Sequence, residues 1–319
     1  MPSTKFNIRV ICQAALVASL LCACFTTSQA DDDIVMVAVG ALQPTQAFIA
    51  HDQVNYKLHR YLIDRRKLFD DLCEVHGRGD RADITAGSVP QQLDSFSCRL
   101  SDITGFAPDT MKTVVRGPGG RYYLTDGHHT FTTFHDFAET GPAFEVPVRV
   151  THDQSGMTRA GFWRWLQQNN LTWLRDADGA AVSPEQVPRQ LGRDSLGNDV
   201  WRGAMYFLRD KVWVKPQPAV PFVEFYWAQH LRQDSQLQPG PLVSAQAYLS
   251  WLQQIAAHIQ ALPDQPGLGP QGQSPDALGR LNTDKQPDLG DLLCAGNEIG
   301  KLGMALAARG IVSDCSQGY

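Results

Sequence analysis

The sequence predicts an α/β fold of the α+β kind, in which a small mixed sheet is followed by a large helical C-terminal extension. Three observations indicate this fold. Apolar, β-branched runs alternate with helical patterns in the order β-α-β-β-α-β over residues 34–152. The runs 113–116 and 121–125 flank the turn sequence GPGG, which is typical of a β-hairpin. Beyond residue 152, apolar and aromatic side chains recur mainly at helical spacing.

Each element of the α/β unit follows from a local pattern. The apolar run IVMVAVGAL at 34–42 predicts a buried strand. Over residues 53–76, apolar side chains recur every three or four residues. Two glycines follow this run, so the pattern predicts one helix. After the hairpin, a helix is expected over 128–139, where Gly-Pro ends it. Alternating apolar residues predict a last strand over 144–150.

The rest of the chain is expected to be helical. A helical extension over 153–262 should pack on the core, with helices at 162–166, 222–231 and 244–262. Residues 263–290 are rich in proline, glycine and glutamine, which predicts a linker or a long loop. Within residues 291–319, a last helix is expected from about 291 to 308, and it would carry Cys294.

The first thirty residues have the pattern of an export signal. Lys5 and Arg9 precede an apolar run that is too short for a comfortable transmembrane helix. Ser28 and Ala30 are small residues at the two positions that a signal peptidase reads. We therefore expect cleavage after Ala30 and a periplasmic or secreted mature chain without a transmembrane helix. Lipidation at Cys24 is the alternative.

Cysteine count and charge both depend on this signal. Of seven cysteines, four would remain after cleavage, and an even count in an exported chain predicts disulfides. Three pairings are possible. Closeness in sequence favours Cys73–Cys98 and Cys294–Cys315, each stabilising the fold by about 3 kcal/mol. The net charge of −5 would become −7, so no global basic field favours nucleic acid and any phosphate must bind at a local site.

The segment TDGHHT at 125–130 is the main candidate site, because it joins a predicted strand to a predicted helix. Free N–H groups and the positive end of the helix dipole suit an anion such as phosphate there. Gly127 allows a close backbone approach or a positive φ. His128 and His129 can donate to phosphate oxygens or move protons, and Asp126 could act as a base or hold a cation. Alternatively, Asp126 merely caps the helix and the histidines pack.

A second polar turn follows the first predicted strand. Thr45 and Gln46 would lie at the same sheet edge as TDGHHT if the two strands are neighbours, and Lys57 could then reach a phosphate. The alternative for Lys57 is a solvated helix lysine. His135 lies two helical turns, roughly 10.5 Å, after His128, too far to share a metal ion. No metal site is predicted from this cluster.

Two charged residues interrupt the aromatic run at 220–232. Glu224 and Arg232 either pair with each other, which we favour, or face the site. The sequence contains no GxSxG elbow, Walker A motif, HExxH motif or dinucleotide fingerprint. The enzyme classes that these motifs define therefore have no support from the sequence.

Several blocks together resemble a known superfamily. The succession LQPTQ, VVRGPGGRYYLTDGHHT and EVPVRV resembles the ParB/sulfiredoxin superfamily, in particular the branch described as ParB-like nucleases, with a ParBc_2-type domain. PRQLGRDSLGNDVWRG and PFVEFYWAQHLR extend the resemblance over residues 34–235. The resemblance implies a ParB/sulfiredoxin-like α/β core over 31–152. Thr130 stands where members often carry arginine, and the segment lacks the cysteine of sulfiredoxins.

The resemblance and the residues lead to one functional hypothesis: an exported nuclease or phosphoesterase. The residues expected to be catalytic are Asp126, His128, His129 and Lys57. Those expected to bind phosphate are Gly127, Thr130, Thr45 and Gln46. A divalent cation is a candidate cofactor, and a phosphate-containing ligand or nucleic acid is the candidate partner. The alternative is a non-catalytic periplasmic module that binds a phosphorylated or other anionic ligand.

Overall fold

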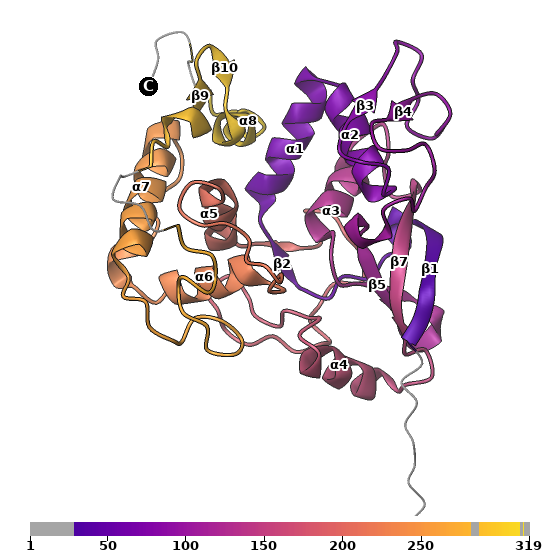
Figure 1. Ribbon diagram of the computed structural model, residues 1–319. Helices are drawn as coiled ribbons and strands as arrows, with labels where there is room; N and C mark the ends of the chain where they lie inside the picture. The colour runs from indigo at the N-terminus through magenta and orange to yellow at the C-terminus, as the bar shows by residue number, and fades with distance from the viewer. Residues whose placement is uncertain (1–28, 282–286, 313–314, 316–319) are drawn as a thin grey trace, which may run out of the picture.

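The structure, a computed structural model, describes residues 29–281, 287–312 and 315. Two lobes lie side by side (Figure 1): a sheet lobe, residues 29–168, and a helical lobe, residues 200–281 and 287–312. No helix in these ranges is long and apolar enough to cross a membrane. The predicted export signal lies almost entirely outside the described residues, which begin at Gln29.

The main sheet has four strands in the order β1-β7-β5-β6. They are β1 (Gln29–Ala38), β5 (Thr113–Arg116), β6 (Tyr122–Leu124) and β7 (Glu145–Asp153). β7 pairs antiparallel with β1 and parallel with β5, and β5 pairs antiparallel with β6. The predicted mixed sheet and its hairpin are thus confirmed. Met36 is 50% exposed whereas its neighbour Val37, on the opposite face of β1, is 7% exposed, so the predicted buried strand is buried on one face only.

The helix predicted over 53–76 is two helices, α1 (His51–Ile63) and α2 (Arg66–Val75). Asp64 leaves the helical conformation with φ −135° and ψ 95°, and its carboxylate accepts a hydrogen bond from the N–H of Arg66 at 3.1 Å. The apolar spacing continues through the break because both helices bury side chains in the core of the same lobe. Periodicity alone therefore did not reveal the turn.

The remaining long helices cover the sheet or form the helical lobe. They are α3 (His128–Asp136), α4 (Arg159–Gln168), α5 (Val200–Leu208), α6 (Val223–Leu231), α7 (Ala245–Ala261) and α8 (Lys301–Ala307). α4 packs on the hairpin through Phe162 and Tyr123, whose ring centroids lie 4.6 Å apart. The prediction missed α5, because eight of its nine side chains are buried and an all-round buried helix shows no polar face.

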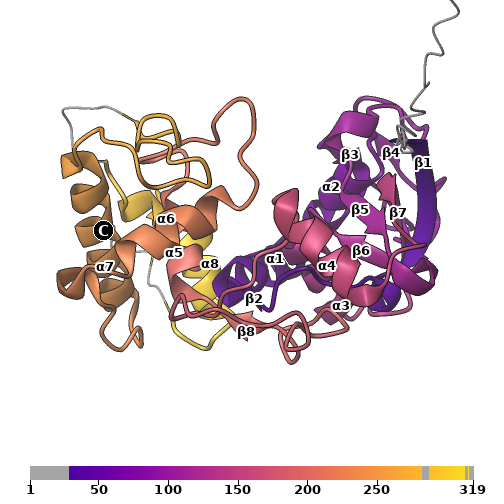
Figure 2. The same ribbon diagram turned by 90° about the horizontal axis from the view of Figure 1, so that it is seen from below.

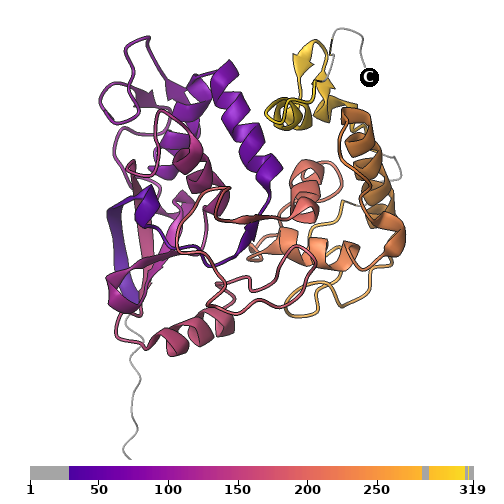
Figure 3. The same ribbon diagram turned by 180° about the vertical axis from the view of Figure 1, so that it is seen from behind.

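The C-terminal prediction was wrong about the secondary structure around Cys294. A short 3-10 turn is followed by a hairpin of β9 (Cys294–Ala295) and β10 (Glu298–Ile299), and only then by α8. The two-residue connection Gly296-Asn297 suits such a hairpin, and Gly296 has a φ of +62°. Figures 1 and 3 both show α8 beside α1, and Arg309 pairs there with Asp52 at 3.2 Å.

The proline- and glycine-rich segment predicted as a linker or loop is a packed loop where it is described. Leu278 is fully buried in the core of the helical lobe. The backbone N–H of Val214 donates to the carbonyl of Gly279 at 2.8 Å, and that of Leu281 donates to the carbonyl of Val212. This segment is therefore a loop packed on the helical lobe and not a linker between two domains.

A short parallel pairing joins the two lobes. β2 (Phe48–Ile49) pairs with β8 (Gly197–Asn198), and Figure 2 shows both strands, with α1, between the lobes. β2 leads directly into α1, and β8 leads into α5, whose first N–H groups are capped by Asp199. The starts of these two helices are therefore held next to each other.

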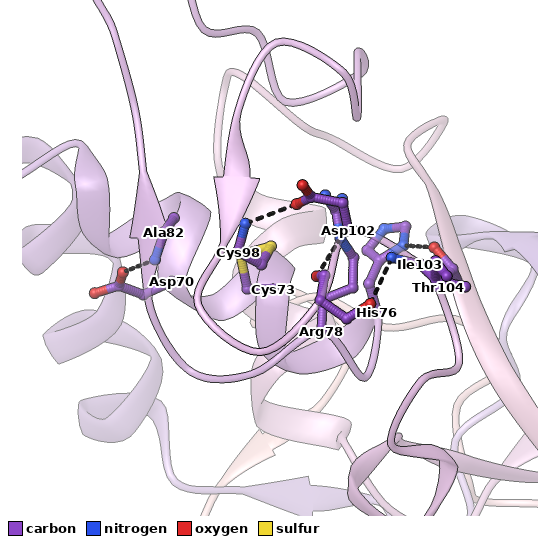
Figure 4. The surroundings of a disulfide bond; sticks show 10 residues. Asp70, Cys73, His76, Arg78, Ala82, Cys98, Asp102, Ile103 and Thr104 are labelled. Carbon is purple, nitrogen blue, oxygen red and sulfur yellow. Dashed lines mark hydrogen bonds and ion pairs between the residues drawn. A yellow bond between two sulfur atoms is a disulfide. The ribbon is translucent and has the colours of Figure 1, made fainter.

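Both predicted disulfides are confirmed: Cys73–Cys98 and Cys294–Cys315, with Cα atoms 5.7 and 5.4 Å apart. Cys73 lies on α2 and Cys98 on β4 (Ser97–Cys98), which pairs with β3 (Ala82–Asp83). Figure 4 shows the buried Arg78 beside this bond, where it donates to Asp102 at 2.8 Å. Two disulfides are consistent with an oxidising compartment outside the cytoplasm.

Candidate functional site

The candidate segment joins β6 to α3 through a left-handed glycine. Gly127 is the N-cap of α3 with φ 98° and ψ 5°, as its position in the sequence predicted. No side chain caps the helix, and the N–H groups of residues 128–130 have no hydrogen-bond acceptor within the described residues. The alternative in which Asp126 caps α3 is therefore wrong. Its side chain is 64% exposed, with an oxygen 3.7 Å from Lys112 Nζ.

Gly127→Ala is expected to lower the free energy of unfolding by about 1–3 kcal/mol. An added Cβ would lie 2.9 Å from Lys112 Cγ and 3.2 Å from Phe131 Cε2, at a φ that L-residues avoid. Gly119→Ala is the matched control, since Gly119 also has a positive φ but nothing within 4 Å. Urea unfolding of both variants checks this, and equal losses would contradict a steric role for the site around Gly127.

Both histidines of the segment hold the chain that precedes α1. The Nε2 atom of His128 accepts a hydrogen bond from the N–H of Thr45 at 3.1 Å. That of His129 accepts one from the N–H of Ala50 at 3.0 Å. An accepting Nε2 places the ring proton on Nδ1. Neither Nδ1 has a hydrogen-bond partner in the part of the chain that the structure describes.

Burial keeps these rings neutral. It lowers the pKa of His128 to about 4, although the Asp126 carboxylate opposes the shift. It lowers the pKa of His129 well below the ordinary value, and the Arg202 guanidinium lowers it further. Near pH 7 each ring therefore offers an Nδ1 hydrogen and no positive charge. An acid–base role for either ring stays a prediction, and it would have to involve Nδ1 while Nε2 binds the backbone.

The polar turn after β1 lies against the same segment. Besides its N–H contact with His128, Thr45 donates its hydroxyl to the carbonyl of Leu124 at 2.6 Å. Gln46 donates its amide to the carbonyl of Phe48 at 2.8 Å. The structure thus brings Thr45 next to His128, whereas the amide group of Gln46 supports the local backbone. Phosphate binding by either residue stays a prediction.

Lys57 is buried in an ion cluster. Its Nζ lies 2.6 Å from Asp71 Oδ2, and the same carboxylate binds Arg60 at 2.8 Å and the hydroxyl of Tyr61. Burial would raise the pKa of Asp71, but the two cations hold it at about 2. Lys57 is therefore not the solvated helix lysine of the alternative interpretation. Its charge acts on His129, while its role towards phosphate stays a prediction.

Glu224 and Arg232 do not form the ion pair that the sequence suggested. Eight residues along α6 correspond to about 12 Å, too far for contact. Arg232 instead binds Asp199 at 2.8 Å. The Glu224 carboxylate lies 3.6 Å from Arg202 and 3.7 Å from Arg209, and Glu224 is only 6% exposed.

Sequence reasoning missed Arg202, whose charge lowers the pKa of both histidines. It is the one charged residue of α5, a signal that could have identified it had the helix been recognised. Its guanidinium donates to the Oε1 atom of Gln53 and lies 5.9 Å from the centre of the Phe225 ring. Its Nε has no hydrogen-bond partner among the described residues.

A preformed metal centre is not evident around this segment. In the described ranges no group of three or more histidine, cysteine, aspartate or glutamate residues could hold a metal ion. His135 contacts Asp136 at 2.9 Å.

Comparison with family models identifies one family. A family model described as "Putative ParB-like nuclease" matches residues 35–233. Among solved structures, the crystal structure of protein Atu1540 from Agrobacterium tumefaciens is similar, with 19% identity and a TM-score of 0.48. That similarity covers 72% of this chain and 93% of the other. None of the curated proteins matches the sequence.

Proposed function

The chain belongs to the ParB-like nuclease family, and from this premise we propose that it is an exported nuclease or phosphoesterase acting at residues 126–129. The observation that carries the proposal is the uncapped start of α3, where backbone N–H groups without protein acceptors lie beside two neutral histidines. Such a helix end binds phosphate oxygens without a formal positive charge. The two disulfides support the export part of the proposal.

In the proposed reaction each residue of the segment has a separate task. The N–H groups of residues 128–130 and the Nδ1 hydrogens of His128 and His129 bind the phosphate oxygens. Asp126 is exposed at the edge of this site, so its carboxylate can accept a proton from the water that attacks phosphorus, while the ester P–O bond breaks and the leaving oxygen takes a proton from solvent. Alternatively, this carboxylate can share a divalent cation with the phosphate. Lys57 adds a nearby positive charge that Asp71 largely balances.

The second candidate is a non-catalytic module that binds a phosphorylated or anionic ligand. One observation favours it: neither histidine titrates near neutral pH, and both Nε2 atoms are occupied by backbone N–H groups. In that case the same donors would hold an anion without cleaving it.

Hydrolysis assays separate the two candidates. The oxidised protein is incubated with DNA, RNA and bis(p-nitrophenyl) phosphate, with and without Mg²⁺ or Mn²⁺. Asp126→Asn should lower kcat at least about 100-fold. Asp109→Asn, the matched control at a side chain that is 93% exposed, should leave kcat unchanged.

Three outcomes are informative. The absence of cleavage by the wild-type protein would refute the enzyme, and saturable phosphate binding without turnover would support the module. Equal cleavage by Asp126→Asn would refute the role of Asp126. A His128→Ala/His129→Ala double variant tests the rings, with circular dichroism as a fold control because it removes two buried hydrogen bonds.

A further inference from the structure

We propose that Arg202, from the helical lobe, is the buried cation of this phosphate site. The ligand's phosphate group would then be bound between the two lobes. The inference rests on the proposed function for the nature of the ligand, but it requires only binding and no turnover.

A short series of contacts links Arg202 to the histidine segment. The guanidinium donates to the side chain of Gln53, whose backbone N–H donates to the carbonyl of Ala50 at 3.2 Å. The N–H of Ala50 in turn donates to the His129 ring. The β2–β8 pairing holds the start of α5 beside that of α1. Arg202 therefore reaches the edge of the sheet lobe from the other lobe.

The Arg202 side chain keeps an unused donor in this position. The residue is 7% exposed, and its Nε has no hydrogen-bond partner among the described residues. A buried donor without an acceptor is costly, so such a group needs an explanation. Glu224, at 3.6 Å, compensates its charge but lies beyond a normal hydrogen-bond distance. An oxyanion could supply the missing acceptor.

The local charge balance also favours an anion. Arg202 and Arg209 both lie near the carboxylate of Glu224, although Arg209 also lies 3.9 Å from Asp210. The Asp199 carboxylate, itself bound to Arg232, also acts on Arg202. Lys215 is exposed and close enough to act electrostatically on both Glu224 and His129. The cluster thus concentrates cations within a chain of net charge −5.

The ligand that fits is a tetrahedral oxyanion. The unused groups are all donors: the Arg202 Nε, the two Nδ1 hydrogens and the N–H groups of residues 128–130. A phosphoryl group presents several acceptor oxygens in different directions, and a guanidinium binds it with directed, charge-assisted hydrogen bonds. His128 and His129 are 4% and 8% exposed, which fits one phosphate group better than a long stretch of nucleic acid.

Calorimetric titration with inorganic phosphate at low ionic strength tests the proposal. Wild-type protein should bind phosphate saturably, and Arg202→Gln should weaken binding by about tenfold or more. Arg164→Gln is the control, since Arg164 is an exposed arginine on α4 and is not part of the Arg202–Glu224–Arg209 cluster. It should change the Kd by less than about threefold. Equal weakening in both variants would overturn the proposal.

A second measurement keeps the test decisive if Arg202→Gln does not fold. In wild-type protein, the NMR resonances of Arg202 Nε–H and of both histidine rings should shift together as phosphate is added. Arg202→Lys, which keeps the charge but lacks the planar donors, should fold and still bind more weakly than wild type. Unshifted Arg202 resonances, or no phosphate binding by the wild-type protein, would overturn the proposal.

The two proposals can fail separately. Phosphate binding that depends on Arg202 without any ester cleavage would sustain this inference and refute the enzyme. Ester cleavage with an unchanged KM and an unchanged phosphate Kd in Arg202→Gln would sustain the enzyme and refute this inference.

Discussion

Asp71→Asn is expected to lower the free energy of unfolding by about 3–5 kcal/mol, because it leaves the buried Lys57 and the partly buried Arg60 without their counter-ion. Lys57 and Arg60 both bind the Asp71 carboxylate, whose side chain is 8% exposed, and Tyr61 donates to it as well. The amide can accept one of these hydrogen bonds but carries no charge. Urea unfolding monitored by circular dichroism measures the loss.

Asp70→Asn is the matched control for Asp71. Asp70 is also buried on α2, but its one cation partner, Lys67, is 35% exposed at 3.0 Å. Asp70→Asn should therefore lower the free energy of unfolding clearly less than Asp71→Asn does. If Asp70→Asn lowers the free energy of unfolding as much as Asp71→Asn does, the ion cluster around Asp71 does not stabilise the fold more than an ordinary ion pair.

The Asp71 cluster also predicts a change in stability in strong acid. The pKa of Asp71 is about 2 in the folded protein, below its ordinary value. Its stabilisation is therefore complete above the ordinary pKa and is lost as the pH falls towards 2. In Asp71→Asn this portion of the pH dependence should be absent.

Acidification from pH 6.5 to pH 4 is expected to destabilise the protein, with about 3 kcal/mol from His128 alone. Burial lowers the folded-state pKa of this ring to about 4. Between this value and the ordinary pKa, the unfolded chain binds a proton that the folded chain does not bind. The unfolded state is therefore favoured as the pH falls through this window. His76, also buried with a pKa of about 4, acts in the same direction.

Urea unfolding at several pH values between 8 and 4 measures this effect. His128→Gln should reduce the slope of stability against pH in that window, because its amide does not titrate. His59→Gln, a substitution on the half-exposed side of α1, is the control. The same slope in His128→Gln as in the wild-type protein would contradict a neutral, buried His128.

Local sequence patterns predicted those elements that depend on neighbouring residues. The GPGG turn between β-branched runs specified the β5–β6 hairpin, because turn chemistry acts within a few residues. The amphipathic helix at 244–262 was correct to within a residue or so at each end, and Ser244 caps it. The two disulfides followed the shortest loops, which are the cheapest to close.

Local patterns failed where tertiary packing overrides them. The break at Asp64 leaves the apolar spacing intact, and the buried α5 has no polar face to detect. The hairpin at Cys294 was mistaken for a helix because the following apolar residues continue a helical spacing.

By itself, the sequence determined the α+β class, the disulfide pairs and the strand–Gly127–helix turn, since all three depend on residue types at short spacing. The tertiary structure alone decided the partners of the side chains. Lys57 pairs with Asp71, and Glu224 lies beside Arg202. The Nε2 atoms of His128 and His129 accept hydrogen bonds from the N–H groups of Thr45 and Ala50. The physical reason is that a buried charge or donor binds whichever opposite group the packing of the lobes brings close, however far away it lies in the sequence.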